Sequence, residues 1–340
     1  MTSARDDIAA QYRAALVAYV HGPDEAGRAC AYDLGHRAVE ARVGLLELIE
    51  IHRRALADVV TDNPTRALIV ASIEFLTESL STFEMAQRGY REAQERAAVA
   101  HDIALTLQRS LLPAELPVPA GLELAVRYLP AGPSVEVGGD WYDVVSLDGT
   151  QVALVVGDVM GHGIPQAAVM GQMRLGLRAY LIEKHPIDDV VRRTDELLES
   201  LGGLHTASLV LGVIDVAAVT LSLANAGHPP PVLVRPTGDA QYVTGGHGRL
   251  LGLRGAADRP VLGPIDVARG SCLLMYTDGL LEHCERAGAD PFERLCGAVE
   301  GFGGSPDELC DHVIRAMVDD EPGDDICLLA VKVVDSPDSG

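Results

Sequence analysis

The chain has 340 residues, of which 48% are hydrophobic and 4% aromatic, enough for one ordinary core and a second, smaller one. Its 27 basic and 49 acidic residues leave a formal net charge of −22, which argues against a nucleic-acid partner because phosphate is repelled. No apolar run reaches the roughly 18 residues of a membrane span and no secretory leader pattern opens the chain, so we expect a soluble, cytoplasmic protein.

The first third of the chain is predicted to be helical. Apolar residues recur there at intervals of three and four, and no strand-like alternation interrupts them. Start signals at Asp24 and at the pair Asn63-Pro64 divide this region. The predicted helices lie near residues 4–20, 24–60 and 64–111, the second with a break near Gly35 or Gly44.

A change of composition marks a domain boundary after this region. Polar REAQERAA gives way to apolar IALTLQRSLL, which is typical of a helix that leaves one core and docks on another. Leu105, Leu107, Leu111 and Leu112 need a hydrophobic surface, and the prolines of LLPAELPVPAG then end the helix. The predicted organisation is a helical bundle over 1–95, a linker helix over 96–112, a mixed α+β domain over 113–336 and a flexible tail over 337–340.

Short β-type runs begin after Gly121 and are separated by Gly, Pro and Asp. The runs are LELAVRYL, DWYDVVSL, QVALVV, TASLVLGVI, TLSLANA, PVLVR, SCLLMYT and ICLLAVKVV, with helical stretches near 164–184, 186–201, 291–300 and 305–318. DWYDVVSL and QVALVV flank Asp148-Gly149, which is a hairpin signal. We therefore expect an α+β fold with mainly antiparallel sheets and helices outside, and not a doubly wound parallel sheet.

Four turns at the edges of these predicted strands carry aspartate. They hold Asp140 in VGGDWYD, Asp158 in GDVMGHG, Asp278 in YTDGLLE, and the pair Asp324-Asp325 in PGDDICLL. Any one of them is equally explained as an Asx-turn or a helix N-cap. Together, on rigid strand ends, such carboxylates would repel one another unless cations lay between them. Oxygen ligands without clustered Cys or His favour Mg²⁺ or Mn²⁺ over zinc.

Two other site types fit the sequence less well. The glycines of GDVMGHG are spaced GxxxGxG instead of GxGxxG, and no GK[ST] follows, which argues against a nucleotide loop. Nucleophilic-serine chemistry lacks its GxSxG turn, since Ser208 and Ser271 lie inside apolar strand runs.

The ordered motifs VGGDWYD, GDVMGHGIPQAAVM, TASLVLGVID, NAGHPPPVLV, LLMYTDGLLE and GDDICLLAV resemble the catalytic domain of bacterial PPM-type serine/threonine phosphatases of the SpoIIE/RsbU branch. The likeness covers roughly residues 105–335 and includes LQRSLLP, while residues 1–95 are similar to the helical N-terminal region of RsbU-like regulators. It implies an α-β-β-α sandwich of two mainly antiparallel sheets. It also implies two Mn²⁺ or Mg²⁺ ions at one sheet edge, which activate a water for attack on phosphorus.

The resemblance also implies which acids hold these ions. Asp158 would bridge both ions. Asp278 and the pair Asp324-Asp325 would hold one of them, with Asp324 the better match to the family's ligand. Asp140 would act directly or through a water.

Three further positions follow from the same comparison of motifs. Val159 stands where many members of the family have Gly and use its carbonyl as a ligand; a valine carbonyl can serve, although the backbone is less free. His162 is a candidate general acid for the leaving serine or threonine oxygen, but a His between two glycines also simply shapes a turn. His228, in NAGHPPP, fits a structural loop near the cleft as well as a catalytic role.

The resemblance implies a phosphatase for phosphoserine or phosphothreonine on a partner protein, an anti-sigma-factor antagonist of the STAS type, in a stress or sigma-factor pathway. An activating partner would bind the N-terminal bundle and act through the linker helix. A non-catalytic scaffold and a small-molecule phosphomonoesterase are the alternatives, and the presence of all four acidic turns favours an enzyme over the scaffold. The long N-terminal helices fit a homodimer or a monomeric bundle.

Overall fold

The computed structural model describes residues 4–60, 64–132, 138–253, 260–286, 290–318 and 322–335. The flexible tail predicted over 337–340 lies outside these ranges. The chain separates into two compact units, Met1–Val99 and Ala100–Gly340. Within the described ranges, no helix has both the length and the apolar character needed to cross a membrane.

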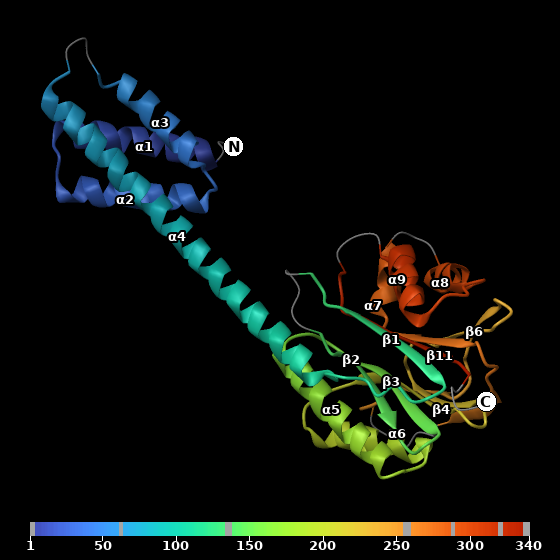
Figure 1. The fold of residues 1–340 in the computed structure, drawn as a ribbon. Helices are drawn as coiled ribbons and strands as arrows, with labels where there is room; N and C mark the ends of the chain where they lie inside the picture. Colours follow the sequence, from blue (N-terminus) through green and yellow to red (C-terminus); the bar gives the residue numbers. More distant parts are fainter. Residues whose placement is uncertain are drawn as a thin grey trace. The chain divides into compact units, whose positions relative to one another are not determined.

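The first unit is built from helices (Figure 1). The predicted break near Gly44 is confirmed, because the chain leaves the helix after Glu40 and Gly44 occupies the N-cap position of the next one, whereas Gly35 lies inside a helix. Asp24 caps the earlier helix by accepting a hydrogen bond from the Gly27 amide at 2.7 Å. Tyr12 and Phe75 are fully buried in the shared core. The elements are α1 (Ala4–His21), α2 (Glu25–Glu40), α3 (Leu45–Ala57) and the first part of α4 (Arg66–Leu111).

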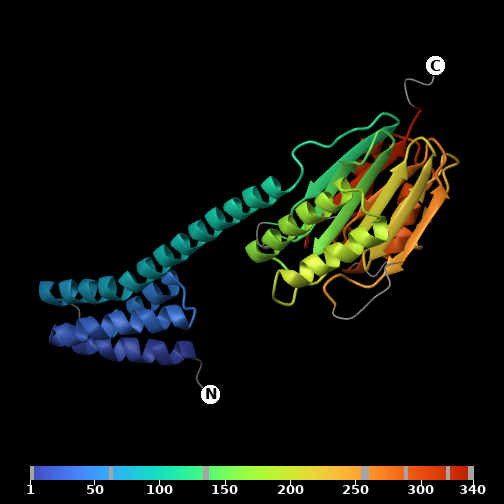
Figure 2. The same ribbon diagram turned by 90° about the horizontal axis from the view of Figure 1, so that it is seen from below.

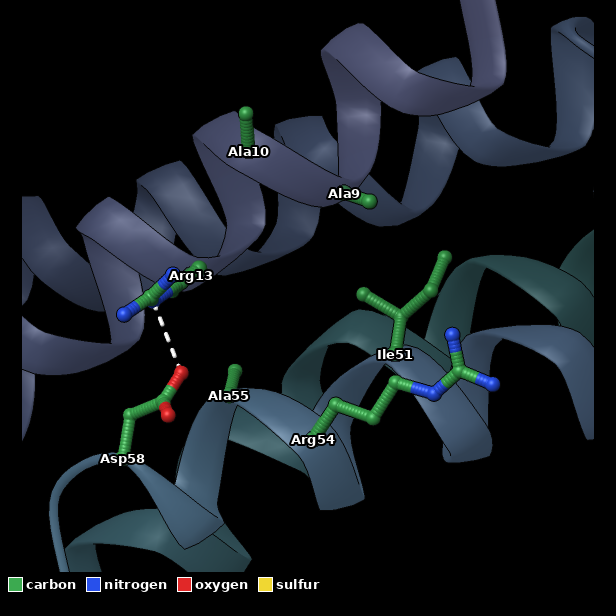
Figure 3. A pocket seen from close by; sticks show the side chains of 7 residues that line it. All are labelled: Ala9, Ala10, Arg13, Ile51, Arg54, Ala55 and Asp58. Atoms are coloured by element: carbon green, nitrogen blue, oxygen red, sulfur yellow. Dashed lines mark ion pairs between the residues drawn. The ribbon is translucent and has the colours of Figure 1, made fainter.

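A small cavity of about 250 Å³ lies between α1 and α3 of this unit (Figure 3). Arg13 and Asp58 form an ion pair of 2.9 Å at its wall, and Arg54 pairs with Glu50 at 2.8 Å. Both pairs are substantially exposed, so each contributes little to stability. The other lining residues are Ala9, Ala10, Ile51 and Ala55. The charged side chains of this wall are thus engaged in exposed ion pairs.

The second unit contains two sheets. One has the strand order β1-β11-β10-β6-β7, and the other has β2-β3-β4-β5-β8 with β9 also paired to β5. Every strand pair is antiparallel except β5 with β8. The strands are β1 (Leu122–Leu129), β2 (Asp140–Ser146), β3 (Gln151–Val159), β4 (Ala207–Asp215), β5 (Thr220–Ala226), β6 (Val232–Val234), β7 (Ala240–Tyr242), β8 (His247–Gly248), β9 (Val261–Asp266), β10 (Cys272–Tyr276) and β11 (Ile326–Val333).

Helices cover the outer faces of both sheets. The helices are α5 (Ile164–Ile182), α6 (Ile187–Ser200), α7 (Gly279–Arg286), α8 (Pro291–Val299) and α9 (Pro306–Met317). The first two lie on the sheet that contains β2 and β3, and the other three lie on the opposite side of the sandwich (Figures 1 and 2). The predicted α-β-β-α sandwich is confirmed.

Strand alternation divides the hydrophobic residues among three layers. On β2 and β3, Val144 and Leu154 face the core between the sheets, whereas Trp141 and Val155 face the core beneath α5. A third core packs α7 to α9 on the other sheet. This alternation decides which acids point into the sandwich and which point toward the helices.

The sequence predicted most of these elements. The hairpin of β2 with β3 is confirmed, with Asp140 opposite Asp158. Helix α7 was not predicted, because it has only eight residues and begins almost directly after a strand. The sequence at its start, TDG, is also typical of a turn. Strands β7 and β8 are too short for a periodic signal, and β9 contains Pro264, which is uncommon inside strands.

The last turns of α4 pack on α5 within the second unit. Leu105 and Leu111 contact Ala167, and a Cβ atom added at Gly171 would lie only 2.8 Å from a Leu111 methyl. Leu112 is buried. The expectation of a covered Leu107 is wrong, because its side chain remains 37% exposed.

Candidate active site

An acidic cavity of about 680 Å³ opens where the ends of several strands meet. Its acidic lining residues are Asp158, Asp278, Glu282 and Asp324. None of its fifteen lining residues is Lys or Arg. The described wall thus concentrates negative charge without a lysine or arginine to balance it.

Three chain segments bring these acids to one place. Asp158 is near the end of β3, Asp278 directly precedes α7, and Asp324 lies just before β11. Antiparallel pairing of β10 with β11 brings the second and third segments together, since the end of one strand meets the start of the other. Their approach is close, because a Cβ atom at Gly279 would come within 2.1 Å of the Asp325 carbonyl oxygen.

Two carboxyl groups of this cluster, those of Asp158 and Asp324, have raised pKa values. Burial raises the pKa of Asp158 to about 7, with further contributions from the negative charges of Asp278 and Asp324. Burial also raises the pKa of Asp324, and Asp278 adds to the effect. A carboxylate that is both desolvated and beside other carboxylates gains most from a bound cation.

Asp140 lies behind Asp158 and does not line the cavity. It is opposite Asp158 in the strand register and only 2% exposed. Its Oδ2 atom is buried without a hydrogen-bond partner among the described residues. Burial, followed by the charge of Asp158, raises the pKa of Asp140 well above its usual value. An orphaned oxygen of this kind suits a cation or a cation-held water.

The donor set fits hard divalent cations. The acids supply oxygen, which Mg²⁺ and Mn²⁺ prefer, and the site contains no thiolate. In the part of the chain that the structure describes, no group of three or more His, Cys, Asp and Glu side chains is placed to hold a metal ion by itself. The carboxylates surround an open cavity, an arrangement compatible with Mg²⁺, which usually keeps several of its waters.

The two adjacent aspartates before β11 differ in their surroundings. Asp324 lines the cavity, whereas Asp325 is 1% exposed and does not. The Asp325 carboxylate accepts a hydrogen bond from the Ala131 amide at 2.8 Å, and Tyr128 and Gln108 both donate to its Oδ2. Burial, with the charges of Asp140 and Asp325, raises the pKa of Tyr128, so the phenol stays a donor. Protein donors thus already engage Asp325.

Val159 and His162 do not line the cavity as described. The Val159 side chain is buried beneath α5, and a Cβ atom at Gly139 would lie 2.2 Å from the Val159 carbonyl oxygen. Gly139 is therefore required for this close approach. His162 is exposed in the turn before α5.

Sequence reasoning missed a polar pair in the cavity wall. His228 Nδ1 lies 2.6 Å from Ser208 Oγ, and its Nε2 lies 3.0 Å from the Tyr276 carbonyl oxygen. Because that carbonyl can only accept, Nε2 carries the proton and the serine hydroxyl donates to Nδ1. Burial lowers the pKa of His228 to about 4, so the ring is neutral. In the strand register Ser208 lies opposite Asp158, and this pairing of strands was not predicted from the sequence.

Comparison with known proteins agrees with this geometry. The family model described as Stage II sporulation protein E (SpoIIE) matches residues 148–334, more than half of the chain. The chain belongs to the SpoIIE family. Residues 10–86 match the model described as Phosphoserine phosphatase RsbU, N-terminal domain.

Individual relatives point the same way. Phosphoserine phosphatase RsbU of Bacillus subtilis is 23% identical over 284 residues, which are 82% of either chain. The structure of the RsbU and RsbW domains of Rv1364c from Mycobacterium tuberculosis is similar at 30% identity and a TM-score of 0.56, over 66% of this chain and 64% of that one. The SiaA-PP2C domain of Pseudomonas aeruginosa shares the fold, with 20% identity and a TM-score of 0.57 over 71% of this chain and 98% of that one. This SpoIIE-family chain is a protein serine/threonine phosphatase.

Proposed function

We propose that this SpoIIE-family chain is a metal-dependent phosphatase of the RsbU type, acting on a phosphorylated anti-sigma-factor antagonist of the STAS type in a stress or sigma-factor pathway. The observation that carries metal dependence is the acidic cavity, in which Asp158, Asp278 and Asp324 gather and no lining residue is Lys or Arg. The match of residues 10–86 to the RsbU N-terminal model, together with the SpoIIE match over residues 148–334, supports the substrate class.

The roles we propose follow the position of each acid. Asp158, flanked by the other carboxylates, would bridge two Mn²⁺ or Mg²⁺ ions, and Asp278 and Asp324 would hold one of them. Asp140 would bind an ion directly or through a water. When bound, the ions supply a nucleophilic water of lowered pKa and neutralise charge on the phosphoryl oxygens. Asp325 accepts hydrogen bonds from protein donors and fixes the turn that carries Asp324, so we rank it behind Asp324 as a ligand.

The backbone beside Asp158 contributes the remaining groups. We propose that the Val159 carbonyl is a ligand, reached through the space that Gly139 leaves open. His162 follows the cavity residues Met160 and Gly161 and is exposed. Its proposed role as general acid is to protonate the leaving oxygen once a substrate protein covers the cavity.

The N-terminal unit is proposed to bind an activating partner protein. Apolar side chains on α3 and α4 remain exposed, among them Leu46 at 80% and Ile73 at 58%. Such residues suit a protein partner or a second copy of the chain. A bundle with this surface is therefore proposed as the regulatory part of the molecule.

The test is dephosphorylation of a phosphoserine-bearing STAS-domain protein by the full-length chain, with Mn²⁺ and in excess EDTA. We expect turnover that requires Mn²⁺, and much slower turnover of p-nitrophenyl phosphate. Full activity in excess EDTA would contradict metal dependence. Turnover of the small ester alone would favour a small-molecule phosphomonoesterase, and no turnover of either substrate with Mn²⁺ would favour a scaffold.

A further inference from the structure

Gln108 is a fully buried polar side chain on the last turns of α4, within the second unit. It lies on the same helix face as Leu105, Leu111 and Leu112, where an apolar residue would be expected. Its amide nitrogen lies 2.6 Å from the Tyr128 hydroxyl and 3.3 Å from the Gly138 carbonyl oxygen, and it also donates to Asp325 Oδ2.

The orientation of this amide is fixed by its partners. The Gly138 carbonyl and the Asp325 carboxylate can only accept hydrogen bonds, so the NH₂ group must face them. The amide oxygen then points elsewhere and is buried without a hydrogen-bond partner in the described ranges. A buried amide oxygen without a hydrogen bond lowers the stability of the folded state, so the hydrogen bonds of the NH₂ group must compensate for it.

Those contacts join two acid-bearing segments of the chain. Gly138 is two residues before Asp140, and Asp325 directly follows Asp324. The segments already lie against each other, since a Cβ atom at Gly138 would come within 2.7 Å of Asp325 Oδ2. Gln108 adds a hydrogen-bonded link between them and connects both to α4.

We propose that Gln108 is a positioning residue for divalent-ion binding. By tethering Asp325 and the Gly138 carbonyl, it holds Asp324 and Asp140 at the separation that the ions require. The end of α4 is then part of the framework of the metal site. This inference rests on the proposed metal-dependent function.

A purely structural role predicts a different outcome. Leu105, Leu111 and Leu112 already seat the helix, so a structural Gln108 would affect the ions only through general loosening of the unit. Gln108→Met keeps the length of the side chain and removes its donors. Val313→Ala is the matched control, because it removes buried volume from the distant core under α9.

The experiment measures two quantities: the Kd for Mn²⁺ of the full-length protein, by calorimetry, and the Mn²⁺ concentration that gives half-maximal turnover. For Gln108→Met we expect both quantities to rise about tenfold or more, with kcat at saturating Mn²⁺ within a few-fold of wild type. Val313→Ala should bind Mn²⁺ as wild type does. Tyr128→Phe removes the other side-chain donor to Asp325 Oδ2 and should weaken binding in the same direction.

Three results would overturn the inference. The first is an unchanged Kd for Mn²⁺ in Gln108→Met, and the second is an equal rise of this Kd in Gln108→Met and Val313→Ala. The third is a Gln108→Met variant that does not fold, together with an unchanged Kd in Tyr128→Phe. Wild-type protein that binds no Mn²⁺ contradicts the proposed function as well. Normal wild-type binding with an unaffected Gln108→Met contradicts the inference alone. The two failures are therefore distinguishable.

Discussion

Strand β2 carries two buried aspartates with opposite surroundings. The carboxylate of Asp143 faces α5, where it meets Arg174 at 3.1 Å and Arg178 at 2.6 Å. Asp140, three residues earlier, faces Asp158 and has an oxygen without a partner among the residues described. The protein supplies the cations for one acid and not for the other. Burial of an acid alone therefore does not indicate a functional site. A buried acid that no protein cation neutralises is the better candidate for a site that binds a cation.

Strand alternation produces this difference. Residues 140 and 143 have opposite parity, so one points into the sandwich and the other toward the covering helices. Arginines on a helix can reach the outward acid, whereas the inward acid lies beside the acidic cavity. Substitutions on the two sides should therefore separate turnover from stability.

The largest expected effect is on turnover. Asp158→Asn and Asp278→Asn should each lower kcat by about 1000-fold, or about 4 kcal/mol of transition-state stabilisation, because metal-binding charge is lost. Measurement of phosphoprotein turnover with saturating Mn²⁺ checks this. Near-normal kcat in either variant would show that the assignment of that residue is wrong.

The same Asp158→Asn change should not destabilise the metal-free protein. The folded pKa of about 7 lies above the ordinary value of 3.8, so the charged form disfavours folding and wild-type stability falls as pH rises from 4 toward 7. Urea unfolding in EDTA should show the variant equal to wild type near pH 4 and more stable above pH 7. A variant less stable than wild type at neutral pH would contradict the repulsion that we describe.

Asp143→Asn should behave in the opposite way. Removing this carboxylate leaves Arg174 and Arg178 without their buried partner, and we expect a loss of about 3 kcal/mol in unfolding free energy. Mn²⁺ affinity and the kcat of the folded fraction should stay at wild-type values. Urea unfolding and a Mn²⁺ titration of the same preparation measure both. Lost Mn²⁺ binding in a folded variant would erase the distinction between the two acids.

A pH-dependent effect of similar size to that of Asp143→Asn is expected at His228. Its folded pKa of about 4 lies below the ordinary 6.5, so its contribution is complete above pH 6.5 and is lost as pH falls toward 4, on the order of 3 kcal/mol. The difference in unfolding free energy between wild type and His228→Asn, measured in EDTA, should therefore shrink over this range. Parallel pH curves would show that the buried ring is not the titrating group.

The residue pattern predicted an α+β fold with mainly antiparallel sheets and acids gathered at one sheet edge, and the resemblance of the ordered motifs to SpoIIE/RsbU phosphatases implied the sandwich. The structure brings Asp158, Asp278 and Asp324 together in one cavity wall. The roles of these acids as ligands stay a prediction. That Asp324 lines the cavity while Asp325 is buried could not be predicted from the sequence, since the surroundings of Asp325 depend on Tyr128 and Gln108. Gln108 and Asp325 are 217 positions apart, and no local pattern encodes where a helix docks.

One measurement tests the central claim most directly: calorimetric titration of Mn²⁺ into metal-stripped, full-length protein at neutral pH. The claim is that the acids around the cavity obtain their neutralising charge from divalent ions. We predict two ions bound per wild-type chain and the loss of at least one in Asp158→Asn. A wild-type chain that binds no Mn²⁺, or an Asp158→Asn variant that binds both ions with wild-type affinity, would contradict it.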